Sequence, residues 1–428
     1  MLLGRGMRHD GRSLARAGTR LTLITSTTGP RPADFNDVRA TNLAVVLRFV
    51  RENAPCSRAD IAASTGLNKA TVSSLVADLI ERRLVRETGL TENRVGRPAT
   101  MLVLDGSPYA AAGIEVNVDG LTVVAVDLSG RQVLTLRKSF PGVGASASQA
   151  VAAVAALARR TVNRMVREER RVLGLVVAVP GLVGVEGRVR FAPNLNWHDV
   201  DLAHDLAAAL RDPEFPIQVD NDANLGALAE HRFGPYGGAG NLVYLTGEVG
   251  VGAGVIVDGR LLRGGQGFSG ELGHVQVDPA GPRCGCGRLG CLEAVAGIGA
   301  VFGRFSDGGP TVSPAVVAPE IDEVVRLARA GDRATLAVLA DIGGSLGKGV
   351  AILANLLNPQ AVVLGGHYVP LAPWLIPAAE AEARVRTIAP DAGGCRIVAS
   401  TLGYGAAALG GAARVLDSIE SGRLPARP

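Results

Sequence analysis

The feature that most constrains this chain is a run of cysteines in its second half. Three cysteines fall within eight residues, in Cys284-Gly285-Cys286-Gly287-Arg288-Leu289-Gly290-Cys291, and His274 precedes them. Three thiolates and one imidazole match a tetrahedral Zn²⁺ site, and a site closed by four protein ligands is structural. The glycines let so short a loop wrap around an ion. We therefore expect a structural zinc ion on His274, Cys284, Cys286 and Cys291; the alternative is a coincidence of cysteines with an unrelated core histidine.

The other two cysteines, Cys56 and Cys395, stand alone in the sequence. Clustering of the remaining three is typical of a metal site in a reducing compartment and not of a disulfide framework. The longest apolar run, Val172–Val185, has 14 residues and contains Pro180, so it is shorter than the roughly 18 residues that a membrane span needs. We expect a cytoplasmic protein that makes no contact with a membrane.

The first hundred residues are more basic than the rest of the chain. They hold 16 Lys and Arg against 9 Asp and Glu, a net charge of +7, whereas all 428 residues together carry only +4. A basic N-terminal quarter on a mildly acidic body suggests a nucleic-acid contact at that end, although a solvated basic tail is the alternative. Residues 1–36 are irregular and basic, and we expect them to form a disordered arm.

The pattern of residues 37–105 is typical of a winged helix-turn-helix. Apolar residues from Leu43 to Val50 recur at helical spacing, and Pro55 ends that helix. Ser57, with Asp60 three residues later, forms a capping-box pattern for a second helix. Asn68 is a suitable N-cap for a third helix, whose apolar residues lie on one face.

The opposite face of the third helix has the properties of a recognition helix. Its residues are short and polar, with one cation at the helix N-terminus, and such a face enters the major groove and reads base edges. Two strands, Leu84–Thr88 and Thr100–Leu104, enclose a loop that would form a wing and place arginines on the DNA backbone or in the minor groove. The predicted DNA contacts are Lys69, Ala70, Thr71, Ser73, Ser74, Arg94 and Arg97. The alternative is a three-helix packing module that does not bind DNA.

After residue 105 the pattern changes to that of a strand-rich α/β protein. Two similar rounds of strands and helices indicate two lobes with a cleft between them, a usual place for a small ligand. The first round has expected strands at Ala111–Asn117, Leu121–Asp127, Gln132–Ser139 and Leu173–Val179, and a helix at Gln149–Arg167. The second has expected strands at Leu242–Gly247, Gly252–Val257 and Ala361–Leu364, and a closing helix near Ala406–Leu416.

Several motifs in this region resemble those of one family. The segment Cys284–Glu293, preceded by Gly270-Glu271-Leu272-Gly273-His274, is similar to the zinc signature of the ROK family, which comprises bacterial repressors, open reading frames and sugar kinases. Asn221-Asp222-Ala223-Asn224 is similar to the sugar-site motif of that family. Asn358-Pro359, with Leu364-Gly365-Gly366, is similar to its adenosine-side segment, a weak match by itself. The resemblance covers roughly residues 38–416.

The resemblance implies an α/β chain in which a winged helix-turn-helix, 37–105, precedes a two-lobed, actin-like sugar-kinase domain, 106–428, that binds a ligand and dimerises. Its first lobe would span about 106–235, its second about 236–400, and a C-terminal helix about 405–417. By the same resemblance, sugar hydroxyls are held by Asn221, Asp222, Glu271, His274 and Glu293. His274 would use one ring nitrogen for zinc and the other for sugar. The alternative for Asn221-Asp222 is a turn and helix cap after the strand Ile217–Asp220.

The phosphate-binding loops of the family kinases are altered here. Asp222 would be the general base of a kinase, but phosphoryl transfer also requires groups that hold the ATP phosphates and Mg²⁺. Family kinases carry Asp-x-Gly-Gly-Thr-Lys after the first strand, where this chain has the segment from Glu115 to Gly120, without the paired glycines and with Asp119 facing the phosphate. In the second loop, Glu248 and Val249 replace Gly-Thr. We therefore expect no catalytic residues and no enzyme activity.

The expected function is repression of sugar-uptake or catabolic genes, relieved by a sugar or sugar phosphate that binds in the kinase-like domain. A homodimer or homotetramer would present its recognition helices to a pseudo-palindromic operator. Two alternatives stay open. One is an ATP-dependent sugar kinase with an added DNA-binding head, and the other is a regulator switched by a protein partner.

Overall fold

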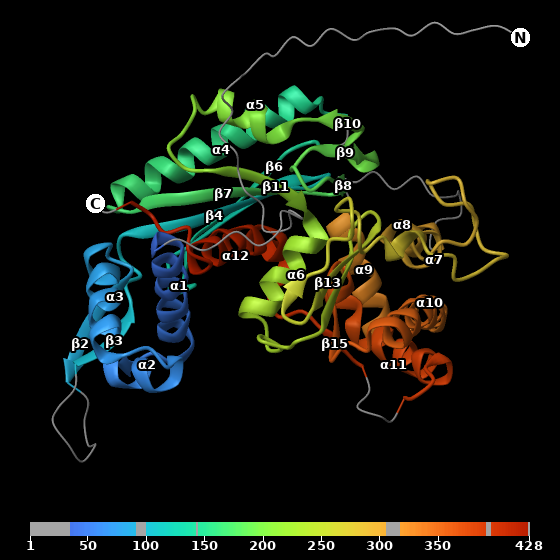
Figure 1. The fold of residues 1–428 in the computed structure, drawn as a ribbon. Coiled ribbons are helices and arrows are strands. Elements are labelled where there is room, and N and C mark those ends of the chain that lie inside the picture. Colours follow the sequence, from blue (N-terminus) through green and yellow to red (C-terminus); the bar gives the residue numbers. More distant parts are fainter. Residues whose placement is uncertain (1–34, 91–99, 143, 305–316, 391–394, 427–428) are drawn as a thin grey trace, which may run out of the picture.

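The computed structural model describes residues 35–90, 100–142, 144–304, 317–390 and 395–426. Two of the predicted DNA contacts, Arg94 and Arg97, lie outside the described residues. The described chain forms a small N-terminal head and a body of two lobes, each built on a five-stranded sheet (Figure 1). The head lies against the first lobe, with helix α1 next to the last helix, α12 (Figure 1).

Three helices and a three-stranded sheet make up the head. Its elements are α1 (Phe35–Asn53), β1 (Cys56–Ser57), α2 (Arg58–Thr65), α3 (Lys69–Glu81), β2 (Val85–Leu90) and β3 (Thr100–Leu104). The capping box predicted for α2 is confirmed, because Ser57 and Asp60 each accept a hydrogen bond from the other's backbone N–H. Asn68 caps α3 by accepting from Thr71 N at 2.8 Å, also as predicted. Strand β1, which pairs with β3, is too short to show an alternating pattern in the sequence.

The first lobe has helices on both faces of its sheet (Figure 1). Its elements are β4 (Tyr109–Val116), β5 (Gly120–Val126), β6 (Gln132–Ser139), α4 (Ala147–Arg167), β7 (Arg171–Val179), α5 (Leu202–Ala209), β11 (Ile217–Asn221) and α6 (Asp222–Phe233). The strand order is β11-β7-β4-β5-β6, with the first three strands parallel. Successive side chains of β4 point to opposite faces, so Ala110 and Ile114 pack in the layer of α4 while Ala111 packs in the layer of α12. Three short strands, β8 (Leu182–Val183), β9 (Val189–Ala192) and β10 (Trp197–Val200), form a separate sheet.

The second lobe repeats the arrangement with a sheet in the order β14-β13-β12-β15-β16. Its strands are β12 (Leu242–Gly247), β13 (Val251–Val257), β14 (Arg260–Leu261), β15 (Ala361–Gly366) and β16 (Arg396–Ala399). Its helices are α7 (Leu292–Ala296), α8 (Ile298–Gly303), α9 (Val317–Arg329), α10 (Arg333–Leu357) and α11 (Tyr368–Arg386). The strands and helices predicted for both rounds are confirmed to within a few residues at each end.

Helix α10 is the one helix, among those described, that is long and apolar enough to cross a membrane by length and composition. Leu339, Ile342 and Leu346 are fully buried in the core of the second lobe. Helix α11 packs so closely that a Cβ on Gly343 would lie 2.6 Å from the carbonyl oxygen of Leu375. Half of the apolar stretch is buried in this way, as in a core helix of a globular lobe.

Helix α12 (Ala406–Glu420) returns from the second lobe to cover the first-lobe sheet beside α6. The approach of α12 to α6 is so close that a Cβ on Gly410 would overlap the backbone of Leu225. A Cβ on Gly113 of β4 would likewise overlap the backbone of Ala408. Because close-packed backbones cannot shift independently, α6, β4 and α12 form one rigid layer.

Candidate functional site

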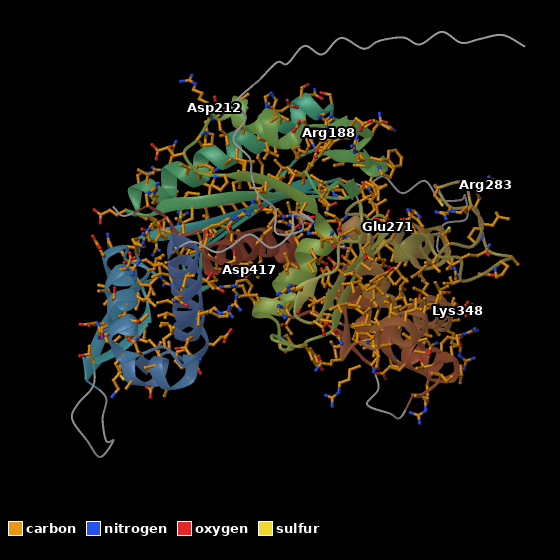
Figure 2. All side chains as sticks on the ribbon, viewed as in Figure 1. Arg188, Asp212, Glu271, Arg283, Lys348 and Asp417 are labelled. Carbon is orange, nitrogen blue, oxygen red and sulfur yellow. The ribbon has the colours of Figure 1, made fainter. Side chains whose placement is uncertain are left out.

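The five residues that the sequence suggests for a sugar site line a single cavity. The cavity has a volume of about 450 Å³ and walls from both lobes. The residues concerned are Asn221, Asp222, Glu271, His274 and Glu293. Glu271 lies at the junction of the lobes (Figure 2), and Asn194 also lines the cavity. A pocket with a few convergent polar groups between two lobes is the usual form of a small-molecule site.

Asn221 and Asp222 lie where β11 passes into α6. Asn221 Oδ1 accepts from Asn224 N at 3.0 Å, so it is the N-cap of α6, and its Nδ2 donates to Gly181 O at 3.0 Å. The helix-cap interpretation is therefore correct for Asn221, in addition to its place on the cavity wall. Asp222 is half-buried, and the pKa of its carboxyl is raised to about 7. Desolvation is the largest cause, Glu248 and Glu271 add to the increase, and the hydrogen bond from Ala223 N opposes it.

Asp220, the residue before Asn221, holds the end of β11 in place. It is 1% exposed and forms ion pairs with Arg263 at 2.5 Å and with Arg414 of α12. Burial alone would raise the pKa of Asp220, but the two guanidinium groups hold it below its ordinary value. Sequence reasoning missed this residue because its partners are 43 and 194 positions away and no local pattern marks them.

The predicted metal ligands come together in one cluster. The ligand atoms of His274, Cys284, Cys286 and Cys291 all lie within 4.8 Å of one another. Cys284 Sγ is 3.7 Å from His274 Nδ1, and Cys286 Sγ is 3.7 Å from Cys291 Sγ. A tetrahedron with Zn–S bonds of about 2.3 Å has edges of about 3.8 Å, so the spacing fits a metal ion. Nδ1 of His274 faces the thiols, which leaves Nε2 for another partner.

The cysteine loop also positions Glu293. Cys291 is the N-cap of α7, and Glu293 lies in the first turn of that helix. Its Oε2 accepts from Val251 N at 3.2 Å and rests against Gly250, where a Cβ would overlap the carboxylate. Gly250, which has no side chain, therefore makes room for the carboxylate of Glu293 at the cavity wall.

A second, much smaller cavity adjoins the first and shares Asp222, Thr246 and Glu248 with it. Glu248 Oε2 accepts from Asn117 Nδ2 at 3.2 Å and lies 3.3 Å from His367 Nε2. Glu115 closes the small cavity. Burial raises its pKa well above the ordinary value, and Glu248 and Asp222 add to this effect.

The first altered loop is held by its own side chains. Val118 N donates to Asn117 Oδ1 at 2.7 Å, so this backbone amide is already occupied. The expectation that Asp119 faces the phosphate position is wrong: Asp119 pairs with Arg137 at 2.9 Å and lines neither cavity. Glu115, by contrast, lines the small cavity. It was missed because a strand residue with a charged side chain gives no sign, in sequence, of the face on which it lies.

Gly252 and Gly254, which follow Glu248 and Val249 in the second altered loop, have a packing role. A Cβ on Gly254 would overlap the backbone of Ala223 at the start of α6, and one on Gly252 would lie 3.0 Å from Ala223 Cβ. These glycines allow β13 and α6 to approach closely. Their presence is therefore explained without a bound phosphate.

The predicted recognition helix presents the expected face. Lys69, Ala70, Ser73 and Ser74 are exposed and Thr71 is half-buried. Val72, Leu75 and Val76 on the other face are buried in the head. The polar face of α3 is therefore free to contact a groove of DNA in the isolated chain.

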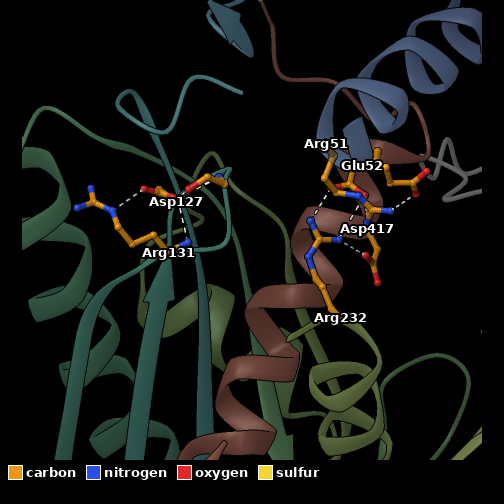
Figure 3. A network of polar contacts seen from close by, with 8 residues as sticks. Arg51, Glu52, Asp127, Arg131, Arg232 and Asp417 are labelled. Atoms are coloured by element: carbon orange, nitrogen blue, oxygen red, sulfur yellow. Dashed lines mark hydrogen bonds and ion pairs between the residues drawn. The ribbon is translucent and has the colours of Figure 1, made fainter. Parts of the chain in front are cut away.

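A buried polar network joins the head to the body (Figure 3). Arg51 of α1 pairs with Glu420 of α12 at 2.8 Å. Glu420 also pairs with Arg232, near the end of α6, at 2.5 Å, and Arg232 pairs with Asp417 at 2.6 Å. Helix α6 therefore has Asp222 at the cavity and, at its other end, an arginine that shares a carboxylate with the head.

The segment after α12 adds a second connection between head and body. Arg82, at the end of α3, donates to Pro425 O at 2.6 Å, and Tyr109 Oη of β4 donates to Arg82 O at 2.8 Å. Leu424 packs on the hydrophobic core that the head shares with the first lobe. The end of the predicted recognition helix is thus fixed to the body from two sides.

Comparisons of sequence divide the chain in the same way. A family profile described as ROK family matches residues 111–418, and one described as MarR family matches residues 44–93. The xylose repressor of Bacillus subtilis (strain 168) is 31% identical over 385 residues, which cover 90% of this chain and 97% of that protein. The DNA-binding transcriptional dual regulator NagC of Escherichia coli (strain K12) is 30% identical over 348 residues, or 80% of this chain and 84% of NagC.

Solved structures give the same picture. A ROK family transcriptional regulator, a homologue of the E. coli Mlc protein, matches with a TM-score of 0.76 at 28% identity, over 90% of this chain and 97% of that one. A ROK family glucokinase from Streptomyces griseus in complex with glucose and AMPPNP matches with a TM-score of 0.58 at 25% identity, over 71% of this chain and 98% of that one. The predicted fold, a winged helix-turn-helix followed by a two-lobed sugar-kinase-like domain, is confirmed.

Proposed function

The chain belongs to the ROK family, and from this membership we propose that it is a DNA-binding transcriptional repressor whose operator affinity is controlled by a sugar. The observation that carries the proposal is that the head and the body together match relatives named as repressors over 90% of the chain. The regulated genes would serve sugar uptake or catabolism, and the protein would act in the cytoplasm. A sugar or sugar phosphate is the effector.

The DNA contact is assigned to α3 and to the loop between β2 and β3. A homodimer or homotetramer would place two copies of α3 in successive major grooves of a pseudo-palindromic site. Lys69, Ala70, Thr71, Ser73 and Ser74 would read base edges. Arg94 and Arg97, outside the described residues, would contact the backbone or the minor groove.

The effector site is assigned to the cavity between the lobes. Carboxylates and amides are suitable partners for vicinal hydroxyls, since each offers two adjacent polar atoms. Asn221 and Asp222 would hold the sugar from the first lobe, and Glu271, His274 and Glu293 from the second. A sugar that bridges both sets favours the closed arrangement of the lobes.

Zinc is assigned to the cluster of His274, Cys284, Cys286 and Cys291, in a closed site with a structural role. When bound, the ion supplies no chemistry to the sugar; it fixes the loop. His274 would bind it through Nδ1 and keep Nε2 for a sugar hydroxyl, and Glu293 would be held at the cavity wall by the helix that begins at Cys291.

We assign no catalytic role to the chain. The amide of Val118 is occupied by Asn117, and two acids, Glu115 and Glu248, line the small cavity beside the proposed sugar site. The second candidate function, a sugar kinase with a DNA-binding head, has in its favour Asp222, the general base by the family resemblance, and the structural similarity to a glucokinase. Turnover of ATP with a sugar, lost in Asp222→Asn, would favour this candidate.

The contact between α1, α12 and α6 offers a route from the cavity to the head. Because α6 belongs to the same rigid layer as α12, a displacement of that layer on sugar binding moves Glu420 relative to Arg51 of the head. A typical coupling of about 1–3 kcal/mol lowers operator affinity roughly 5–150-fold, and operator DNA weakens sugar binding by the same factor.

The test measures operator affinity with and without sugar. DNA selected by the full-length protein from a random pool supplies the operator, and D-xylose, D-glucose and N-acetyl-D-glucosamine, with their phosphates, supply the sugars. We expect one of them to weaken operator binding in the wild type but not in Glu271→Ala. Glu214→Ala, a substitution of a side chain that is 92% exposed, is the control. If the wild type bound the operator with equal affinity with and without every sugar, the proposed response to sugar would be wrong. A protein partner would then be favoured as the switch.

A further inference from the structure

The inner end of the sugar cavity is lined by carboxyl groups. Asp222, Thr246 and Glu248 line both cavities, so they lie where the two meet. Behind them is Glu115, which is 7% exposed and whose Oε2 has no hydrogen-bond partner among the described residues. Within the described part of the chain, no lysine or arginine lines the small cavity. A group that enters this end of the cavity therefore meets acids and no fixed cation.

Glu248 is held in position from three sides. Its Oε2 accepts from Asn117 Nδ2 at 3.2 Å and lies 3.3 Å from His367 Nε2. Its Oε1 rests against Gly366, where a Cβ would overlap the carboxylate and where φ is +59°. The carboxylate is therefore built into the junction of the two cavities by residues from both lobes.

Among the described residues, one arginine, Arg288, lines the large cavity. It belongs to the cysteine loop, it is exposed, and its Nε donates to Cys286 Sγ at 3.5 Å. Arg288 does not line the small cavity. It therefore does not offset the charge of Glu248 at the inner end.

We propose that the effector is an uncharged, unphosphorylated sugar and that Glu248 is the residue that excludes its phosphate ester. The inference rests on the proposed function, because it concerns the same cavity. A sugar hydroxyl donates a hydrogen bond to Glu248 or Asp222 and is stabilised there. A phosphate dianion has no proton to donate to an ionised carboxylate, and like charges in a partly desolvated cavity repel strongly. Specificity of this kind comes from a repulsive group placed against the competing ligand.

Titration calorimetry on the full-length protein tests the inference. The probes are D-glucose, D-xylose and N-acetyl-D-glucosamine, each paired with its phosphate ester, at a pH of about 8. We expect at least one uncharged sugar to bind at least tenfold more tightly than its ester, a ratio that corresponds to about 1.4 kcal/mol. Glu248→Gln keeps the shape of the side chain without its charge and should reduce this ratio severalfold, whereas Glu214→Gln should leave it unchanged.

Two outcomes would overturn the inference. One is an ester that binds the wild type as tightly as its sugar or more tightly; the other is a ratio that Glu248→Gln does not change. In both cases a sugar response persists and the proposed function stands. If none of the probes binds in either form, the sugar-binding part of the proposed function fails, and the inference fails with it.

Discussion

At the scale of single residues, Asp222 gives the cavity a dependence on pH. Burial, together with Glu248 and Glu271, raises its pKa to about 7. A sugar hydroxyl donates to the ionised carboxylate, so sugar binding favours ionisation and the affinity must fall as the pH decreases below about 7. We expect the dissociation constant of the bound sugar to rise by up to about tenfold per pH unit in that range. Calorimetry between pH of about 6 and 8.5 measures this.

The matched variant for this prediction is Asp222→Asn, which has no ionisable group at the position. Its sugar affinity should be weaker than that of the wild type at a pH of about 8 and should vary little with pH. A wild-type affinity that increases toward acidic pH would contradict the assignment of Asp222 as a hydrogen-bond acceptor. If the sugar affinity of Asp222→Asn still varied with pH as in the wild type, a group other than Asp222 would be responsible for the pH dependence.

At the scale of elements, the cysteine loop joins the four proposed zinc ligands to the cavity wall. Cys286→Ser should lose one equivalent of zinc by elemental analysis, because three ligands do not close the site. Sugar affinity should fall about 10–100-fold, the usual cost of disturbing groups that orient a metal site, since His274 and Glu293 lose their support. The described part of the head packs on the first lobe and α12 and not on the second lobe, which carries this loop (Figure 1), so operator binding without sugar should be retained.

Cys395→Ser is the control for the cysteine loop, because Cys395 lies outside the metal cluster. It should keep the metal and the sugar affinity. A zinc-free wild-type protein that binds sugar as tightly as the zinc-loaded protein would show that the ion does not support the cavity.

The sequence predicts contacts within one helix or strand better than contacts between elements that are far apart along the chain. The caps of α2 and α3 depend on residues three positions apart, so Ser57 and Asn68 could be recognised from local pattern. The contact between Asn117 and Glu248 joins residues 131 positions apart, and that between Arg51 and Glu420 joins residues 369 apart. Neither pair has a local signal. The cavity residues were identified by family motifs, whereas the acids and amides that surround Glu248 required the fold.

At the scale of the whole molecule, one ion pair connects the head to the layer that contains α6. Arg51→Gln removes the bond to Glu420 and leaves the pair between Glu420 and Arg232 intact. We expect the sugar to bind and the operator to bind, while the effect of one on the other becomes smaller by about 0.5–2 kcal/mol, or roughly 2–30-fold. Fluorescence titration of operator DNA, with and without saturating sugar, gives the two affinities.

Arg48→Gln is the matched control, because Arg48 is an exposed residue of the same helix. It should leave the ratio of the two operator affinities unchanged. If Arg51→Gln also retains the wild-type ratio, the route through Glu420 does not carry the coupling, and the contacts of Arg82 with Pro425 and Tyr109 become the next candidates.

Helix α12 has a consequence for how the protein is made. It begins at Ala406, whereas β4, against which it packs, ends at Val116. A ribosome that adds about 5–20 residues per second needs roughly 15 to 60 s to cover that interval. Until then the head has no Glu420 to dock on, and the sheet face around Ala111 and Val176 lacks its covering helix. Every nascent chain therefore passes through a stage with a DNA-binding head and no sugar control, and chains that terminate early remain in it.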